Sequence, residues 1–403
     1  MKILDFNEGK VNLGEALSDV KRMIETDMVG MCRNMLGEVF EKAIGLEFDE
    51  FMCIGRYQRK ETRKNYRNGY RERKLLTQVG ELNLKIPRAR LESFNPSCVE
   101  RYKRVDRHLN RLIRELYLSG VSTRKVEGIM KSLCGCGVSA GYVSNVTKAL
   151  DEKVKEMSNM PIEKGIVFLF LDGIYVRVKV GLNAQRRVIL VAYGVRRDGS
   201  RQLISWKIAK KESGSSWKSF LENIEVRGLK GGDLKLIIMD GAPGLWSAVE
   251  EVYPLVEKQL CWVHKLRNVS KYGSKKLSRE CVQEAAKIMY AGSKGRADNM
   301  FRLWKRKWLD KIPKAVECLE KDYDKLVGFF AFDVSMHKIL RTTNVIERCF
   351  RELRRRVSPM GGCFQDTGSC NRIICSLFCY FNNKWSPKHQ HIKIVEQYYK
   401  LVA

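Results

Sequence analysis

The sequence predicts an α/β protein whose mixed sheet is flanked by long helical segments. Three observations lead to this fold class. A nearly continuous apolar run at 165–180, "GIVFLFLDGIYVRVKV", is typical of a strand buried in the middle of a sheet. Strand and helix patterns then alternate as far as residue 269. Helix-like sequence fills residues 1–55 and 270–335.

Composition narrows the class of protein. The chain has 403 residues, more than one compact core usually holds, so we expect two or more domains. Its 75 Lys and Arg oppose 46 Asp and Glu, giving a net charge of +29 that favours a polyanionic partner. Nucleic acid fits best, since each neutralised phosphate releases counterions. An anionic membrane surface is the alternative.

Two features bear on the cell compartment. No stretch approaches the roughly 18–20 apolar residues that span a bilayer. Acidic residues stand where a signal peptide would have its apolar core. We therefore expect a cytoplasmic protein without a membrane partner, whose 13 cysteines are mostly small buried residues.

The N-terminal part combines helices with a basic segment. Residues 1–55 have the pattern of amphipathic helices, and residues 51–110 hold 16 Lys and Arg against six acids. Within them, "YRERKLLTQVGELNLKIPRAR" alternates around Gly80, which predicts a basic β-hairpin ending near Pro87. A solvated charged surface is the alternative to phosphate binding. The hairpin cations expected to bind phosphates are Arg71, Arg73 and Lys74.

Residues 106–155 contain two helix patterns separated by a short turn. Ser122 can cap a first helix at 123–133, and Ser139 can cap a second that runs through residue 148. This is the helix-turn-helix pattern, whose second helix enters the major groove of DNA. An ordinary helical hairpin is the alternative. The side chains expected to face DNA are Tyr142, Ser144, Asn145 and Lys148.

After Pro161 the pattern becomes that of an α/β core. The apolar run at 165–180 precedes two strands around Asp198–Gly199 and a capped helix in "GSSWKSFLENIEVRGL". Next, "LKLIIMDGAPGLWSAVEEVY" predicts a buried strand and a helix, and "KQLCWVHKLRNV" a short strand and another helix. Three antiparallel strands, a helix, a parallel strand and a helix fit a core with one central buried strand.

Two aspartates follow the most apolar strand segments. Asp172 ends the apolar run 166–171, and Asp240 ends the run 236–239. Functional groups gather at the carboxyl ends of strands, and a bare carboxylate there is costly unless a cation binds it. Mg²⁺ suits such oxygen ligands. The alternative is an Asp-Gly hairpin turn, as we expect at Asp198, which has solvated neighbours.

Glu347 is a third candidate carboxylate, near the start of the predicted helix in "TTNVIERCFRELRRRV". It lies beside the apolar stripe of that helix, at the margin of the core. The alternative is a capping box in which Asn344 and Glu347 satisfy backbone amides. The stripe consists of Ile346, Phe350, Leu353 and Val357. The arginines expected to bind phosphates are Arg351, Arg354 and Arg355.

Three carboxylates from two strand ends and one helix suggest a two-metal site for phosphoryl transfer. Attack by water at such a site gives hydrolysis, and attack by a 3′-hydroxyl gives strand transfer. Two other functions remain open from these residues. One is a DNA-binding regulator without catalysis, which leaves the aspartates unexplained. The other is a nuclease that only hydrolyses.

The chain resembles the Mutator-type transposases of bacterial insertion sequences along nearly its whole length. The matching segments are "LDGIYVRV", "LIIMDGAPGL", "CWVHKLRNV" and "RTTNVIERCFRELRRR". The resemblance implies a ribonuclease-H-like core with an Asp-Asp-Glu triad, which by motif match is Asp172, Asp240 and Glu347. It also implies Mg²⁺, for which Mn²⁺ can substitute, and an all-helical insertion at 270–335.

The resemblance further implies a bacterial, nucleoid-associated DNA transposase. Its partners would be double-stranded DNA, both terminal inverted repeats and target. Because both ends must be handled together, we also expect a homodimer, with the N-terminal helices as one candidate interface. The expected regions are 1–55 helical, 56–105 basic hairpin, 106–155 helix-turn-helix, 160–269 first part of the core, 270–335 insertion, and 336–403 C-terminal part of the core.

Two smaller signals complete the candidate site. Cys261 and His264 match the Cys-x-x-His signature of the family, but two ligands alone do not make a zinc site. His264 is either a DNA contact and support for the active site or a satisfied core histidine. Trp304 and Trp308 share one helix face and either belong to the core or stack on an unpaired base.

Overall fold

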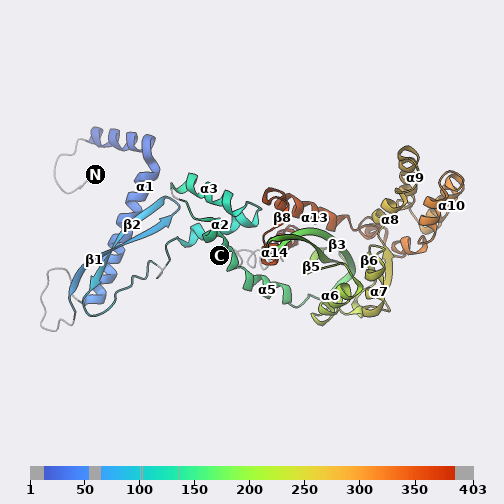
Figure 1. Ribbon diagram of the computed structural model, residues 1–403, viewed down its shortest axis with the longest axis horizontal. Helices are drawn as coiled ribbons and strands as arrows, with labels where there is room; N and C mark the ends of the chain where they lie inside the picture. The colour runs from blue at the N-terminus through green and yellow to red at the C-terminus, as the bar shows by residue number, and fades with distance from the viewer. Residues whose placement is uncertain (1–12, 54–64, 100, 102, 136, 386–403) are drawn as a thin grey trace. The chain divides into compact units, whose positions relative to one another are not determined.

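The computed structural model describes residues 13–53, 65–99, 101, 103–135 and 137–385 (Figure 1). Parts of three predicted regions, at 1–12, 54–64 and 386–403, lie outside the described residues. The chain divides into two units. Unit 1 comprises Met1–Tyr117 and Ser122–Thr147, and unit 2 comprises Leu118–Val121 and Lys148–Ala403.

Unit 1 begins with a long helix packed on a hairpin. Helix α1 (Leu13–Met52) changes direction at Asp27, where φ is −153° and ψ is 64°. The hairpin, strands β1 (Arg67–Thr77) and β2 (Gly80–Ala89), confirms the predicted turn before Gly80. Buried apolar residues of both elements form the core between them, including Ile44, Phe48, Leu82, Leu84 and Ile86.

The predicted helix-turn-helix pattern is confirmed at the level of its helices. After α2 (Arg107–Leu118) come α3 (Thr123–Cys134) and α4 (Ala140–Lys148). The Lys125 amide donates to Ser122 Oγ at 3.3 Å, and the Tyr142 amide donates to Ser139 Oγ at 3.1 Å. Both predicted serine caps therefore form, because each hydroxyl accepts from an otherwise unpaired amide of the first turn.

Unit 2 is built on a mixed sheet, which confirms the α/β class. Its strand order is β5-β4-β3-β6-β7, and β8 also pairs with β3. The first three strands in sequence are antiparallel, whereas β6 runs parallel to β3, and β7 parallel to β6. Their bounds are β3 (Ile166–Val180), β4 (Asn183–Arg196), β5 (Arg201–Ala209), β6 (Leu236–Met239), β7 (Glu257–Leu260) and β8 (Cys363–Phe364).

Helices cover both faces of this sheet (Figure 1). Helices α6 (Gly214–Val226) and α7 (Pro243–Val252) share a core with it that includes the buried Trp217. Helix α14 (Thr367–Trp385) lies against the other face, where the Trp206 indole donates to Asn371 at 3.0 Å and the Tyr193 ring contacts Trp385. Helix α5 (Asp151–Asn159) leads into the sheet after α4.

The stretch between β7 and α14 is helical apart from β8, as predicted for 270–335. Its elements are α8 (Trp262–Val269), α9 (Lys275–Ile288), α10 (Lys294–Trp308), α11 (Pro313–Glu320), α12 (Val334–Leu340) and α13 (Asn344–Val357). The Phe301 and Tyr323 rings stack at 4.0 Å between centroids inside this part. Across the described residues, no helix is long and apolar enough to cross a membrane.

Candidate active site and nucleic-acid interface

Strand register brings the two predicted aspartates level. Phe170 of β3 pairs with Ile238 of β6, and the same register continued by two residues brings Asp172 level with Asp240, which directly follows β6. Asp240 follows the last residue of β6, as predicted. Asp172 was expected to end its strand or to form a turn. Both expectations are wrong, because β3 continues to Val180 along its long partner β4.

Burial gives Asp172 an unusual carboxyl group. The residue is 5% exposed, and its Oδ1 accepts a hydrogen bond from the Gly173 amide at 2.8 Å. Burial raises the pKa of Asp172 to about 6. The charge of His264 opposes that rise, and the charges of Asp240 and Glu347 add to it. The three predicted carboxylates and His264 are therefore close enough for their charges to interact.

Glu347 takes part in the site and not in a capping box. Helix α13 begins at Asn344, and Thr343 is its N-cap residue, so Asn344 is one position too late to cap. The Glu347 Oε1 instead forms an ion pair with Arg267 Nη2 at 2.5 Å and lies 3.9 Å from His264 Nε2. The predicted apolar stripe is confirmed, since Ile346, Phe350, Leu353 and Val357 are all buried.

Cys261 connects the sheet to the helix that carries Glu347. Met239 pairs with Leu260, which places Cys261 level with Asp240. The Cys261 Sγ accepts from the Thr343 amide at 3.3 Å and lies 3.4 Å from Thr343 Oγ1. The start of α13 is thereby held against the end of β7. This is a positioning role for the cysteine of the Cys-x-x-His signature, which the spacing alone did not indicate.

Gln259 adds a second connection between the same segments. Its Nε2 donates to the Leu340 carbonyl at 2.9 Å, and its Oε1 accepts from the Phe329 amide at 2.6 Å. Gln259 itself is fully buried. Nothing in the sequence distinguishes Gln259 or Thr343 from ordinary polar residues, because their partners lie far away along the chain.

A cavity of about 340 Å³ opens beside Asp240. One wall is formed by His264, Arg267 and Asn268 of α8 and by Lys271, which follows the helix. Burial acts to lower the pKa of His264, but Cys261, Asp172 and Asp240 outweigh it and raise that pKa to about 9. The predicted His264 thus lies in the site. Arg267 and Lys271 were not predicted, although Arg267, three residues after His264, shares its helix face.

The chemistry of the three carboxylates fits a divalent metal ion. Their oxygens are hard ligands of the kind that Mg²⁺ prefers, and their mutual repulsion is what a cation would relieve. Within the described ranges, however, no three His, Cys, Asp or Glu side chains are gathered closely enough to hold one ion. In this structure the Glu347 carboxylate is paired with the Arg267 guanidinium.

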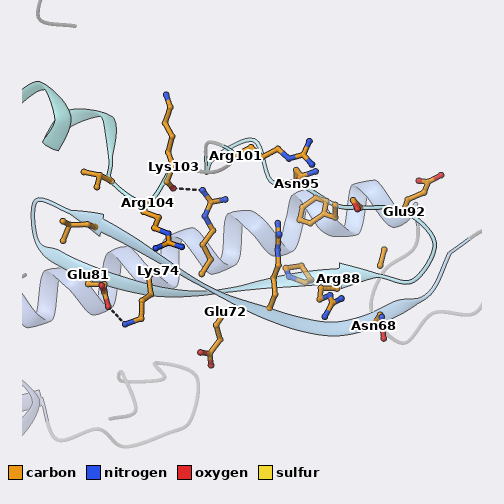
Figure 2. A pocket seen from close by; sticks show the side chains of 18 of the residues that line it. Asn68, Glu72, Lys74, Glu81, Arg88, Glu92, Asn95, Arg101, Lys103 and Arg104 are labelled. Carbon is orange, nitrogen blue, oxygen red and sulfur yellow. Dashed lines mark hydrogen bonds and ion pairs between the residues drawn. The ribbon is translucent and has the colours of Figure 1, made fainter. Parts of the chain in front are cut away.

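Unit 1 carries a large basic groove beside the hairpin (Figure 2). Its volume is about 1360 Å³. Arg73 donates to the Lys103 carbonyl at 2.7 Å, and Lys74 pairs with Glu81 at 2.7 Å. Ser139 and Tyr142, at the start of α4, also line the groove. Its cationic lining contains all three predicted hairpin residues and consists of Arg71, Arg73, Lys74, Arg88, Arg90, Arg101, Lys103 and Arg104.

The predicted DNA-facing residues of α4 differ in exposure. Asn145 and Lys148 are exposed, whereas Ser144 and Tyr142 are half-buried. The Tyr142 hydroxyl donates to Asn110 Oδ1 of α2 at 2.9 Å, and burial raises the pKa of this phenol. The structure therefore leaves Asn145 and Lys148 open to solvent and uses Tyr142 inside unit 1. Their contact with DNA stays a prediction.

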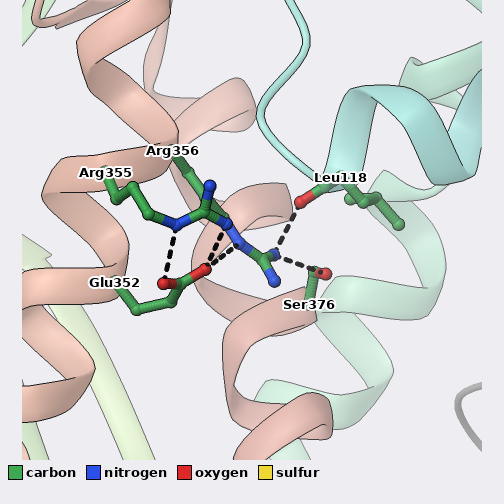
Figure 3. Close-up of polar contacts among 5 residues, drawn as sticks. All are labelled: Leu118, Glu352, Arg355, Arg356 and Ser376. Atoms are coloured by element: carbon green, nitrogen blue, oxygen red, sulfur yellow. Dashed lines mark hydrogen bonds and ion pairs between the residues drawn. The ribbon is translucent and has the colours of Figure 1, made fainter.

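The arginines of α13 fall into three groups. Arg348, Arg351 and Arg354 are exposed. Arg355 pairs with Glu352 through two hydrogen bonds of 2.9 and 2.7 Å. Arg356 is 8% exposed, and Figure 3 shows it donating to Glu352, to Ser376 and to the Leu118 carbonyl. Only the first group faces solvent without an ion-pair partner among the described residues.

Trp304 and Trp308 lie in the core of the helical part. They are 4% and 1% exposed. The Trp304 indole donates to the Cys281 carbonyl at 3.0 Å, and the Trp308 indole donates to Glu284 at 2.9 Å. This placement matches the core alternative that the sequence left open, and it leaves neither ring face accessible to a base in this structure.

Comparison with known proteins places the chain in a family. The family model described as "Transposase, Mutator family" matches residues 9–387. A transposase for insertion sequence element ISRM5 from Rhizobium meliloti is 33% identical over 96% of this chain and 95% of that protein. A transposase for insertion sequence element IS256 in transposon Tn4001 from Staphylococcus aureus is 34% identical over 88% and 90%.

A solved structure, the Drosophila P element transposase strand transfer complex, aligns with 75% of this chain and 85% of that chain. Its identity is 10% and its TM-score 0.27, too low to carry a conclusion about the fold. The family model and the two sequence relatives are sufficient by themselves. This chain belongs to the Mutator family of transposases.

Proposed function

We propose that this transposase moves an insertion sequence by metal-dependent cleavage at the element's terminal inverted repeats and transfer of the 3′-hydroxyl ends to target DNA. The observation that carries the proposal is the level register of Asp172 and Asp240, with Glu347 interacting electrostatically from α13. Support for a ribonuclease-H-like core comes from three antiparallel strands followed by two parallel ones in the order β5-β4-β3-β6-β7.

Asp172, Asp240 and Glu347 are the residues that would hold the metal, with Mg²⁺ as the expected ion and Mn²⁺ as a substitute. When bound, the metal ions would activate the attacking oxygen and stabilise the leaving one. The protein supplies the positions of the ligands. Asp172 lies within β3 and Asp240 directly follows β6, and the Cys261–Thr343 contact would hold the start of the helix that carries the third carboxylate.

The cations near the carboxylates would bind the DNA backbone. The raised pKa of His264 favours its cationic form in the metal-free protein, and the side chain faces the cavity beside Asp240 together with Arg267 and Lys271. Arg267 neutralises Glu347 in the present structure, and a phosphate can replace that carboxylate as its partner. Arg351 and Arg354 extend the exposed positive surface along α13.

Unit 1 would recognise the element ends. The basic groove beside the hairpin is suited to phosphates, and α4 would read base edges in the major groove. Because two ends have to be processed together, we propose a homodimer that acts on DNA in the bacterial cytoplasm, at the nucleoid. The subdivision into the six predicted regions belongs to the same proposal, with 270–335 as the insertion.

A gel assay tests this function. Purified protein is incubated with labelled element-end DNA and a target plasmid, in Mg²⁺ or in EDTA, and wild type is compared with Asp240→Asn. We expect joined products that need Mg²⁺ and that disappear in the variant, while binding to the ends persists. Asp198→Asn, in an exposed turn, is the matched control and should leave joining unchanged.

The other two functions give different products. Cleaved but never joined DNA would indicate a nuclease that only hydrolyses. Tight binding without any cleavage would indicate a regulator. The control is that another active transposase of the element cleaves the same end DNA. Either result would refute strand transfer by this chain.

A further inference from the structure

The strand that carries Asp172 extends beyond the active site into an unusual hairpin. Strand β3 runs from Asp172 on to Val180, which pairs with Asn183 of β4. The chain therefore turns in two residues, Gly181 and Leu182, and Gly181 has the positive φ of +64° that such a turn requires.

Leu182 has no role in folding at this position. Its side chain is fully exposed, at 101% of the reference area. Residues of tight hairpin turns are usually glycine, asparagine or aspartate, because these adopt the backbone conformation and are well solvated. A fully exposed leucine gains no hydrophobic stabilisation from the fold, so its whole side chain is available to a partner outside the chain.

The charged side chains of the two strands near this tip are all positive. Arg177 lies directly opposite Arg186 in the ladder, a pairing of like charges that destabilises a sheet unless an anion is bound. Lys179 and Arg187 are next to them, and the sequence has no acidic residue between Asp172 and Asp198. Arg186 lies over the Tyr175 ring, with its guanidinium carbon 3.8 Å from the centroid.

The length of the hairpin sets its distance from the reacting groups. Strands rise about 3.3 Å per residue, so Val180 is roughly 26 Å from Asp172 along β3. Duplex DNA rises about 3.4 Å per base pair, so the same length corresponds to about eight base pairs. A duplex that lies along β3 with its reacting phosphate at Asp172 would meet the hairpin tip about eight base pairs away.

We propose that residues 177–187 form a second DNA-binding element, in which Leu182 enters the minor groove of the element-end duplex and separates two base pairs. Arg177 and Arg186 bind phosphates on either side of it. Apolar wedges flanked by cations are a known means of unstacking and bending DNA. The proposal rests on the proposed function for the identity of the duplex, and it adds a contact about eight base pairs from the cleavage point.

The binding experiment uses the full chain and element-end DNA in EDTA, so that no cleavage takes place. Affinity is measured by fluorescence anisotropy at several salt concentrations. Arg177→Gln/Arg186→Gln should reduce the slope of log affinity against log salt by about two, because about 0.9 counterions are released per phosphate. The control pair Lys276→Gln/Arg279→Gln, on exposed positions of α9, should leave the slope unchanged.

The wedge is tested by 2-aminopurine placed singly six to ten base pairs from the cleavage point. Wild type should increase the fluorescence at one position near eight, since the unstacked base is no longer quenched. Leu182→Asn should lose that signal and bind roughly tenfold more weakly with an unchanged salt slope. Leu255→Asn is the matched control: Leu255 is 98% exposed but lies among acidic residues, and its change should affect neither readout.

Three outcomes would overturn the proposal. The first is an unchanged salt slope in the double arginine variant. The second is a 2-aminopurine signal that persists in Leu182→Asn. The third is a change in sedimentation without a change in DNA binding, which would assign the tip to a second copy of the chain. Loss of joining in Asp240→Asn tests the proposed function separately, because that variant should keep both hairpin readouts.

Discussion

Replacing the buried Arg356 with alanine should destabilise unit 2 strongly. The guanidinium donates to the Leu118 carbonyl at 2.6 Å, to Ser376 Oγ at 3.2 Å and to Glu352 Oε1 at 3.3 Å (Figure 3). It is the contact through which α13 holds the segment Leu118–Val121. Because the side chain is 8% exposed, water cannot take over these hydrogen bonds without opening the packing.

The expected loss follows from these contacts. A hydrogen bond from a charged donor contributes about 1.5–3 kcal/mol, and breaking a buried pair by removing one partner costs about 3–5 kcal/mol. Glu352 keeps its two bonds to Arg355, which limits the charge that is left unpaired. We therefore expect a loss of about 3–4 kcal/mol in the free energy of unfolding of unit 2, mainly because the Leu118 carbonyl is left without a hydrogen-bond donor.

Urea denaturation provides the measurement. The chain has two units, so the midpoint of the unit 2 transition is compared between variants instead of one extrapolated free energy. Arg354→Ala, exposed on the same helix, is the control and should change stability by less than about 0.5 kcal/mol. Equal midpoints for Arg356→Ala and Arg354→Ala would refute the assigned role of the buried guanidinium.

The contribution of Glu352 to the stability of unit 2 should fall in acid. Hydrogen bonds from Arg355, opposed by burial and supported by Arg356, hold the pKa of Glu352 below its ordinary value. A carboxyl group with a lowered folded-state pKa stabilises the protein above its unfolded pKa of about 4.3 and loses that contribution as the pH falls through the folded value. The midpoint difference between wild type and Glu352→Gln should therefore be largest near neutral pH and shrink in acid.

Four further changes have defined outcomes. Gly120→Ala should cost at least about 2 kcal/mol in urea melts, because φ is +95° and a Cβ would lie 2.8 Å from the Arg356 backbone; Gly295→Ala, with open space around it, should be neutral or stabilising. Cys261→Ala should slow joining about tenfold without affecting end binding in EDTA, and serine should recover part of the rate. Trp304→Ala should cost about 3–5 kcal/mol, with DNA binding intact in the folded phenylalanine variant. Asp172→Asn should abolish joining and raise the melting temperature in EDTA.

Local patterns predicted the elements of this fold well. The apolar run at 165–180, the serine caps and the turn before Gly80 each depend on neighbours in sequence, and each is confirmed. The expectation that Asp172 stands at a strand end was wrong, because the length of β3 depends on its partner strand. Strand β4 continues past Asp172, whereas β6 stops before it, and neither fact is visible in the residues around the Asp-Gly pair.

The site was predicted less completely, since its supporting contacts join distant segments. Arg267 meets Glu347, and Cys261 meets Thr343, across 80 or more residues of helical sequence. Helical spacing could have predicted that Arg356 is buried. It is three residues after the buried Leu353, on the apolar side of α13, whereas Arg354 and Arg351 point to solvent. The position of an arginine in the helical repeat of α13 therefore distinguishes a buried structural arginine from one that faces solvent.

The stability of Asp172→Asn separates a catalytic carboxylate from a structural one. A structural buried aspartate is stabilised by its partners, so removing its charge weakens the fold. Asp172 accepts one hydrogen bond, from Gly173, and burial and two other carboxylates raise its pKa. Its charge is therefore a cost in the metal-free protein, and the variant should melt higher in EDTA, with Asp198→Asn unchanged. Mg²⁺ should raise the melting temperature of wild type but not of Asp172→Asn. A variant that melts lower in EDTA would mean that Asp172 serves the fold.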